Sequence, residues 1–194
     1  FISSIPILLL SKYGSLSQVG TYAIAYMVIE GVASMIAGTL YAINLSSFIN
    51  RDGNTLDYKI IKKYNMSIIL PAIFGYLVLL FYGSELFAII FGKEFMEAAS
   101  WALLCTPLIT LSHLAKPYLL VFGVRRTQHK MLYIDIVFFL LMVVAGVLAL
   151  FYDVDVYEVM VLYAVLQGLR YVTFIVFCNA ESKGARSAGR FGSL

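Results

Sequence analysis

The segment MLYIDIVFFLLMVVAGVLALFY, residues 131–152, is apolar throughout and holds a single charge, Asp135. A helix needs about 20 apolar residues to cross the hydrocarbon core of a bilayer, so this segment predicts a transmembrane helix. Four further stretches of the same character predict spans of their own, at residues 21–48, 64–82, 100–122 and 157–178. Helix is the expected state because an open strand in lipid would leave its backbone groups unpaired.

The composition agrees with this interpretation. Only 13% of the residues are charged, about half the share usual in soluble domains, and the mean hydropathy is +0.89. Residues 1–10 are apolar but too few to span, so we expect a sixth, truncated span there. The sequence therefore predicts an all-α, polytopic membrane bundle and, because it begins inside a span, the C-terminal half of a larger carrier whose N-terminal half is absent.

The positive charges alternate along the chain. The first, third and fifth connections carry six acids and few cations, whereas the second and fourth connections and the C-terminal tail hold ten cations: Arg51, Lys59, Lys62, Lys63, Arg125, Arg126, Lys130, Lys183, Arg186 and Arg190. Cytoplasmic loops are enriched in Lys and Arg. We therefore expect the even connections and the C-terminus of this multi-pass membrane protein to be cytoplasmic.

Three segments outside the spans have a predicted form. Residues 56–64 show an amphipathic pattern, with Asn54 or Thr55 as helix cap, which predicts a helix lying in the inner interface. The apolar run 86–91, broken by Gly92, is too short to span and predicts an interfacial turn. Residues 1–178 form the predicted bundle, and residues 179–194 are expected to be a disordered, basic cytoplasmic tail.

Charges inside a span are costly, by about 2.5 to 3.5 kcal/mol each on insertion scales, and normally face the bundle interior. In the 21–48 span, Glu30 belongs to a polar stripe with members three, four or seven residues apart: Tyr22, Tyr26, Glu30, Ser34, Tyr41 and Asn44. Two interpretations remain open for Glu30. It either pairs with a neighbouring helix in a structural seam, or it lines a cavity and binds a proton or cation coupled to transport.

The 100–122 span carries Thr106, Thr110, His113 and Lys116 on one side, together with Pro107 and Pro117. Proline removes a backbone donor, so we expect this helix to be kinked and its carbonyls opened near Lys116. Lys116 either extends to the inner headgroups or meets an anionic substrate in a cavity. His113 is either a hydrogen-bonded core residue or a proton relay.

The last span places Tyr163, Gln167 and Arg170 on one face. Arginine offers a planar fork that suits phosphate or carboxylate. Asp135 lies at the same predicted depth as Arg170, so a structural ion pair between them is the leading expectation. If that pair forms, Lys116 becomes the better candidate for binding substrate.

Other functional classes find little support in the sequence. Cys105 and Cys178 lie far apart inside apolar runs and are expected to be packed thiols, with no disulfide, metal or cofactor. Catalytic triads and phosphate-cradling glycine loops are absent, so no enzyme is predicted. The basic residues lie in short loops beside the bilayer, which argues against a nucleic-acid partner.

Several short motifs carry a resemblance to a known family. The stretch Val19-Gly20-Thr21-Tyr22-Ala23-Ile24-Ala25-Tyr26 is similar to the family's Gly-x-Tyr-x-x-Ala start of a helix, and the apolar run before Gly92-Lys93-Glu94-Phe95 and Ala98 is similar to its outer turn. The chain thus resembles the C-terminal half of a polysaccharide-biosynthesis (O-antigen type) flippase of the multidrug/oligosaccharidyl-lipid/polysaccharide exporter superfamily. The resemblance implies a MATE-like bundle of two pseudo-symmetric halves that moves a polyprenyl-diphosphate-linked oligosaccharide across the bilayer.

Such a substrate requires cations and hydroxyls in a hydrated cavity. The predicted substrate-binding residues are Lys116, Arg170, His113, Tyr22, Tyr26, Tyr163 and Gln167, and the predicted ion-coupling residues are Glu30 and Asp135. Two alternatives remain: a cation-coupled multidrug exporter of the same superfamily, in which Glu30 and Asp135 bind the drug, and a non-transporting membrane scaffold.

Overall fold

The structure, a computed structural model, describes residues 7, 10–12, 14–49, 57–124, 126–152 and 154–191. Its elements are helices: α2 (Leu16–Asn44), the 3-10 turn η2 (Leu45–Ser47), α3 (Tyr58–Phe91), the 3-10 turn η3 (Lys93–Phe95), α4 (Ala98–Val124), α5 (Gln128–Tyr152) and α6 (Val156–Phe191). Five of them are long and apolar enough to cross a membrane. The predicted all-α polytopic bundle is confirmed; most of the predicted truncated span, residues 1–10, lies outside the described residues.

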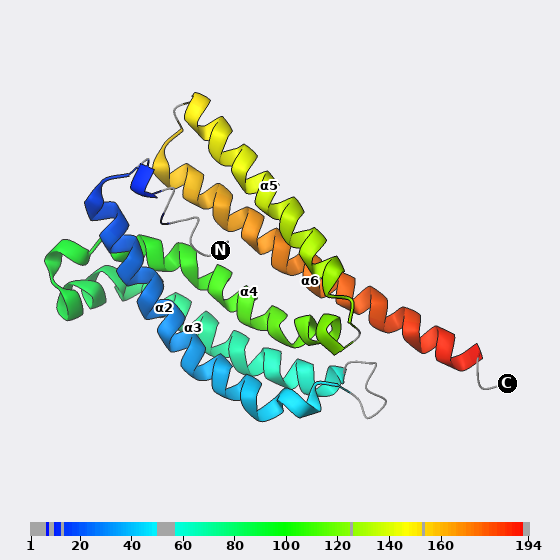
Figure 1. Ribbon diagram of the computed structural model, residues 1–194. Coiled ribbons are helices and arrows are strands. Elements are labelled where there is room, and N and C mark those ends of the chain that lie inside the picture. Colours follow the sequence, from blue (N-terminus) through cyan, green and yellow to red (C-terminus); the bar gives the residue numbers. More distant parts are fainter. Residues whose placement is uncertain are drawn as a thin grey trace.

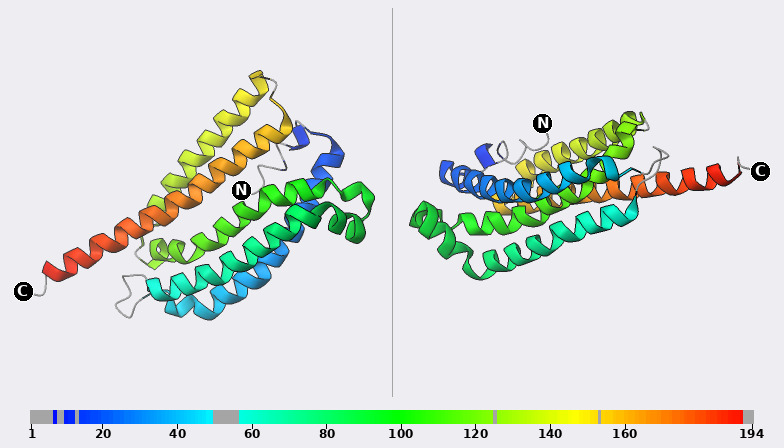
Figure 2. Two further views of the ribbon diagram at one scale, coloured as in Figure 1. Left: turned by 180° about the vertical axis from the view of Figure 1, so that it is seen from behind. Right: turned by 90° about the horizontal axis from the view of Figure 1, so that it is seen from below.

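Consecutive helices run in opposite directions (Figures 1 and 2). The end of α2, the start of α3, the end of α4 and the start of α5 therefore meet at one end of the bundle, and α6 extends beyond that end. Basic side chains gather there, among them Lys59, Lys62, Lys63, Arg126 and Lys130. The opposite end carries Glu85, Glu94, Glu97, Asp155 and Glu158. Charges that alternate along the chain are thus separated in space, while the assignment of one end to the cytoplasm stays a prediction.

Helix α4 lies at the centre of the bundle. It packs against α2, α3 and α6, and α5 joins the bundle mainly through α6 (Figure 1). Half of the α4 span is buried, compared with 6% of the α5 span. The apolar side chains that α5 exposes, such as Val137, Leu140 and Val144, form the kind of surface that lipid covers. The functional side chains of α4 are therefore the ones that the fold shields best.

Helix α3 corrects two of the predicted connections. Residues 58–64 of the expected interfacial helix and the expected turn at 86–91 are the two ends of one continuous 34-residue helix. The amphipathic pattern is present, with Ile61 and Tyr64 buried and Lys62 exposed, but it packs the first turns of α3 onto the bundle. The helix cap is Asp57, whose carboxylate accepts from the amides of Lys59 and Ile60; residues 54–56 lie outside the described part. No proline lies at either predicted boundary, residues 62–67 and 82–86, so the helix can continue across both of them.

The remaining helix limits differ by a few residues, with one exception. Helix α2 starts at Leu16, five residues before the predicted start, because Ser15 and Gln18 form a reciprocal capping box. Helix α6 runs to Phe191, whereas we expected disorder from Asn179 onward. Alanine, glutamate, lysine and arginine in that segment favour helix, and no proline interrupts it. The polar composition that predicted disorder is thus compatible with a helix that continues from the bundle.

Gly92 ends α3, as the sequence predicted. Its φ of +112° is accessible to glycine but strained for other residues, and its amide donates to the Ala88 carbonyl at 3.1 Å. The turn η3 then leads into α4. The reversal between α3 and α4 therefore depends on one residue type at one position.

We expect Gly92→Ala to destabilise the protein by about 1 to 2 kcal/mol, because an L side chain is unfavourable at that backbone conformation. The measurement is the apparent unfolding midpoint of the purified protein in detergent. Gly20→Ala is the matched control, since Gly20 is helical and has open space around it; it is expected to be neutral or slightly stabilising. Equal effects of the two substitutions would contradict the role assigned to Gly92.

Candidate functional site

Three ionisable side chains from α2 and α4 meet inside the bundle. The Nε2 atom of His113 lies 3.6 Å from Oε1 of Glu30, and the Nδ1 atom of His113 lies 2.8 Å from Nζ of Lys116. Ser34 donates its hydroxyl to the same Glu30 oxygen at 2.7 Å. Glu30, His113 and Lys116 are called the polar triad below. The structure thus brings together three residues that the sequence predicted separately.

The members of the polar triad differ in burial. His113 is 1% exposed, whereas the side chain of Glu30 is 35% exposed and Lys116 is half-buried. The Nε2 atom of His113 has no hydrogen-bond partner in the part of the chain that is described, because 3.6 Å exceeds hydrogen-bond distance. Glu30 therefore pairs loosely with a neighbouring helix, and the imidazole is the buried link between two more accessible charges.

Lys116 does not extend along α4 toward the basic end of the bundle. Helical side chains lean toward the helix N-terminus, and its ammonium accordingly reaches back one turn to His113. Lys116 also lines a pocket of about 790 Å³ together with Tyr41, Gln128 and Met131, among others. The structure therefore favours the interior position of Lys116 over the alternative of a headgroup contact.

The second proline of α4 leaves one backbone carbonyl without its helical hydrogen bond. Tyr64 of α3 supplies the missing donor. Pro117 has no amide to donate to the His113 carbonyl, and the Tyr64 hydroxyl donates to it instead at 3.1 Å. The helix remains continuous from Ala98 to Val124 across both prolines. The expectation of a freed carbonyl near Lys116 is confirmed, with a partner that sequence spacing could not identify.

A second polar group joins α5 and α6. Nε of Arg170 lies 2.7 Å from Oδ1 of Asp135, which confirms the predicted ion pair. Arg170 also donates to the Gln167 side chain at 3.0 Å, and Gln167 donates to the Tyr163 hydroxyl at 3.0 Å. The guanidinium lies 5.3 Å from the ring centres of both Tyr171 and Phe174. Arg170 is thus held by a carboxylate, an amide and two rings.

Tyr171 of α6 lies near both polar groups. It interacts electrostatically with Glu30, with Asp135 and with Arg170. On α2, Tyr26 is close enough to Glu30 for a similar interaction. Helical periodicity did not identify Tyr171, because it directly follows Arg170 and so faces a different side of an ideal helix. The signal that could have identified it is its place one turn after Gln167.

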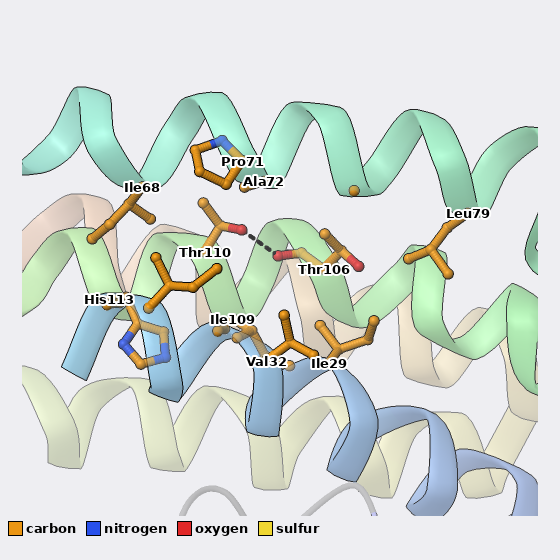
Figure 3. A pocket seen from close by; sticks show the side chains of 14 residues that line it. Ile29, Val32, Ile68, Pro71, Ala72, Leu79, Thr106, Ile109, Thr110 and His113 are labelled. Carbon is orange, nitrogen blue, oxygen red and sulfur yellow. Dashed lines mark hydrogen bonds between the residues drawn. The ribbon is translucent and has the colours of Figure 1, made fainter. Parts of the chain in front are cut away.

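An apolar pocket of about 180 Å³ adjoins the polar triad between α2, α3 and α4 (Figure 3). His113 lies at one end of it and Leu79 at the other, with Ile109 between them. The hydroxyls of Thr106 and Thr110, which also line it, donate back to carbonyls of their own helix at 2.7 Å. The two threonines therefore contribute little polarity, and the pocket suits an apolar group.

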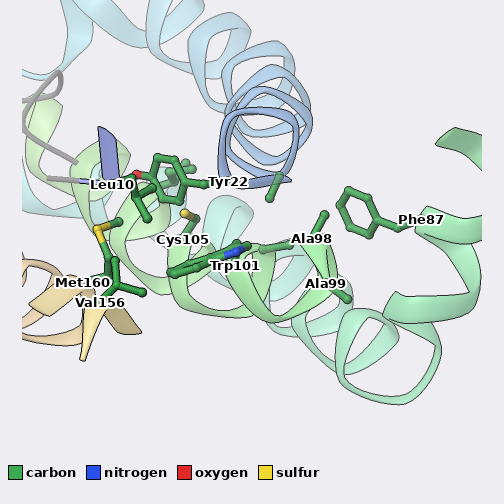
Figure 4. Packing of buried hydrophobic residues seen from close by; sticks show 12 residues of the cluster. Leu10, Tyr22, Phe87, Ala98, Ala99, Trp101, Cys105, Val156 and Met160 are labelled. Atoms are coloured by element: carbon green, nitrogen blue, oxygen red, sulfur yellow. The ribbon is translucent and has the colours of Figure 1, made fainter. Parts of the chain in front are cut away.

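Three of the predicted substrate-binding residues lie in packed surroundings. Tyr22 packs in the core beside Cys105, with its ring 5.8 Å from that of Trp101 (Figure 4). Tyr163 and Gln167 are buried in the polar group that supports Arg170. Both cysteines are buried, in agreement with the expectation of packed thiols. The partly exposed members of the predicted set are Lys116, Arg170 and Tyr26 and, among the ion-coupling residues, Glu30 and Asp135.

In the described ranges, no group of three or more His, Cys, Asp or Glu side chains gathers closely enough to hold a metal ion. Comparison with protein-family models, with curated proteins and with solved structures finds no match for this chain.

We predict that Tyr64→Phe costs about 1 kcal/mol of stability, because it leaves the His113 carbonyl without a donor. In a Pro117→Ala background, residue 117 regains an amide that can donate to that carbonyl, so the cost should fall toward zero. A double-mutant cycle of unfolding midpoints in detergent measures this coupling. Tyr133→Phe, at a residue that is 67% exposed, is the control; equal costs of Tyr64→Phe in both backgrounds would refute the pairing.

Removing one member of the ion pair should destabilise the protein more than removing both. Asp135→Asn leaves Arg170 unpaired at a cost of about 2 to 3 kcal/mol, somewhat below that of a fully buried pair, because the two side chains are 26% and 13% exposed. The double variant Asp135→Asn with Arg170→Gln should recover part of that loss. Strictly additive losses in unfolding measurements would show that the two residues are not coupled.

Proposed function

We propose that this chain belongs to a membrane transporter that flips a polyprenyl-diphosphate-linked oligosaccharide across the bacterial plasma membrane for surface polysaccharide synthesis. The proposal assigns transport and no catalytic step to the protein. In this proposal the carrier has a second half, against which the described helices would move in alternating access. The C-terminus is assigned to the cytoplasm.

The observation that carries the proposal is the environment of Lys116. Within the described residues, no carboxylate lies within 4.0 Å of its ammonium, whose hydrogen-bond partner is Nδ1 of His113. Arg170, in contrast, is neutralised by Asp135. An in-span cation is costly unless it meets an anion. Lys116 lines a pocket, so a diphosphate group could reach it there.

Supporting groups surround that cation. Tyr41 and Gln128 line the same pocket and offer a hydroxyl and an amide for sugar hydroxyls. The apolar exterior of α3 and α5 lies against lipid, where the polyprenyl chain of such a substrate would remain. The chemistry required by the substrate, an anion site inside and a lipid-compatible surface outside, is thus present on one set of helices.

A second candidate function is export of a cationic drug. One observation favours it: the accessible carboxylate of Glu30 adjoins the apolar pocket, so a hydrophobic cation could place its charge on Glu30 and its body against Ile29 and Ile109. In that case Glu30, and not Lys116, would dominate transport. The two functions therefore predict opposite rankings of the same two variants.

The test replaces Lys116 in the intact protein and measures surface polysaccharide. Lys116→Ala should lower export at least about tenfold, and Lys116→Arg should retain part of it, because the loss of one charged hydrogen bond is worth about 1.5 to 3 kcal/mol. Lys62→Ala is the matched control, an equal change of charge at an exposed residue in the first turns of α3.

Normal export by Lys116→Ala at normal protein level would remove the assignment. If drug resistance, and not polysaccharide, depends on the protein and is lost with Glu30→Gln, the second candidate replaces the first. If neither phenotype depends on the protein, a scaffold without transport is the remaining interpretation.

A further inference from the structure

We infer that the polar triad is a proton-transfer chain, in which His113 carries protons between Glu30 and Lys116. The coupling role of this chain rests on the proposed transport function, which it deepens by naming the proton as the coupling ion. Three features support this inference: the positions of the two imidazole nitrogens, the burial of the ring, and the partial exposure of Glu30 and Lys116.

The contact with Lys116 determines where the imidazole proton lies. An ammonium group has three donors and no acceptor, so Nδ1 of His113, 2.8 Å from Nζ, must accept. A neutral imidazole with a bare Nδ1 carries its proton on Nε2. That nitrogen faces Glu30 Oε1 at 3.6 Å, so the His113 N–H points toward a carboxylate that can take the proton.

The transfer can be written with every proton accounted for. Lys116 passes one proton from Nζ to Nδ1 of His113, and His113 passes the proton on Nε2 to Oε1 of Glu30. One Nζ–H bond and the Nε2–H bond break, while an Nδ1–H bond and an Oε1–H bond form, and no electrons are transferred. The imidazole stays neutral and changes tautomer, and the ammonium and carboxylate become an amine and a carboxylic acid.

This exchange has a physical consequence in a membrane. The charged form of the polar triad is costly wherever water is excluded, whereas the neutral form is not. The 3.6 Å gap must shorten to a hydrogen bond of about 2.7 to 3.2 Å for the transfer, a shift of less than about 1 Å. A small movement of α2 relative to α4 therefore switches the transfer on or off.

Both ends of the chain are more accessible than its centre. Glu30 is partly exposed on α2, and Lys116 lines the pocket with Tyr41 and Gln128. His113 between them is buried, and Tyr64 holds its backbone carbonyl. A proton that enters at Lys116 can therefore leave at Glu30 through the imidazole.

Other titratable groups near the polar triad are already engaged. On α6, Arg170 is paired with Asp135 of α5, and Tyr171 lies between that pair and Glu30. On α2, Tyr26 is near Glu30. On α3, the Tyr64 hydroxyl donates a hydrogen bond to the His113 carbonyl. Within the described residues, His113 is the imidazole placed to connect the two free charges.

The first experiment measures the His113 tautomer by nitrogen-15 NMR on labelled, intact protein in lipid at neutral pH. His129→Gln removes the signal of the other histidine, which is exposed at the start of α5. We expect a protonated Nε2 and a bare Nδ1. A proton on Nδ1, or on both nitrogens, would overturn the inference whatever the protein transports.

The second experiment reconstitutes the intact protein in liposomes with a lipid-linked oligosaccharide and imposes a pH gradient. The wild-type rate should increase several-fold with the gradient, and His113→Gln should lose this response while His129→Gln keeps it. A wild-type response in His113→Gln would overturn proton coupling. If the wild type moves no lipid-linked sugar under any condition, the proposed function fails, and the tautomer measurement still decides the proton-transfer chain.

Discussion

The cost of placing charge away from water governs this molecule. Glu30, Lys116, Asp135 and Arg170 lie in the interior parts of the described spans. Each is placed against a partner contributed by another helix or one turn away on its own. Because α4 is the helix that α2, α3 and α6 all contact, it carries the two residues that most need shielding, His113 and Lys116. The arrangement of the bundle and the position of the candidate site are thus consequences of the same constraint.

The sequence was sufficient for those features that depend on length and polarity. Five spans, the break at Gly92 and the pairing of Asp135 with Arg170 follow from apolar runs, a glycine and matching depth. The continuous α3 could not be predicted, because rules about span length say where a helix may leave the membrane but do not require it to end there. Disorder after Asn179 was expected from composition, which cannot separate a solvated helix from a coil.

For the candidate site, too, some features could be predicted from the sequence and others could not. Sequence spacing placed Glu30, His113 and Lys116 on interior faces, but it could not show that one imidazole touches both charges, since this depends on how α2 crosses α4. Some members of the same helical stripes are buried, namely Tyr22, Tyr163 and Gln167. Helical spacing shows which residues share a face, but it does not show how deeply each of them lies within the bundle. Tyr64 is the last residue of the amphipathic pattern at 56–64, and the role of its hydroxyl depends on a proline in a different helix.

The length of α3 links the site to the surrounding lipid. Its 34 residues extend about 51 Å, and even a tilt of about 40° leaves about 39 Å along the membrane normal, more than the roughly 30 Å of a hydrocarbon core. The helix must therefore project into the headgroups, and its inclination responds to the thickness of the bilayer. A movement of α3 therefore also displaces the Tyr64 hydroxyl, which is hydrogen-bonded to the carbonyl of His113. A thicker or thinner membrane would in this way alter the distance over which the buried imidazole meets Glu30.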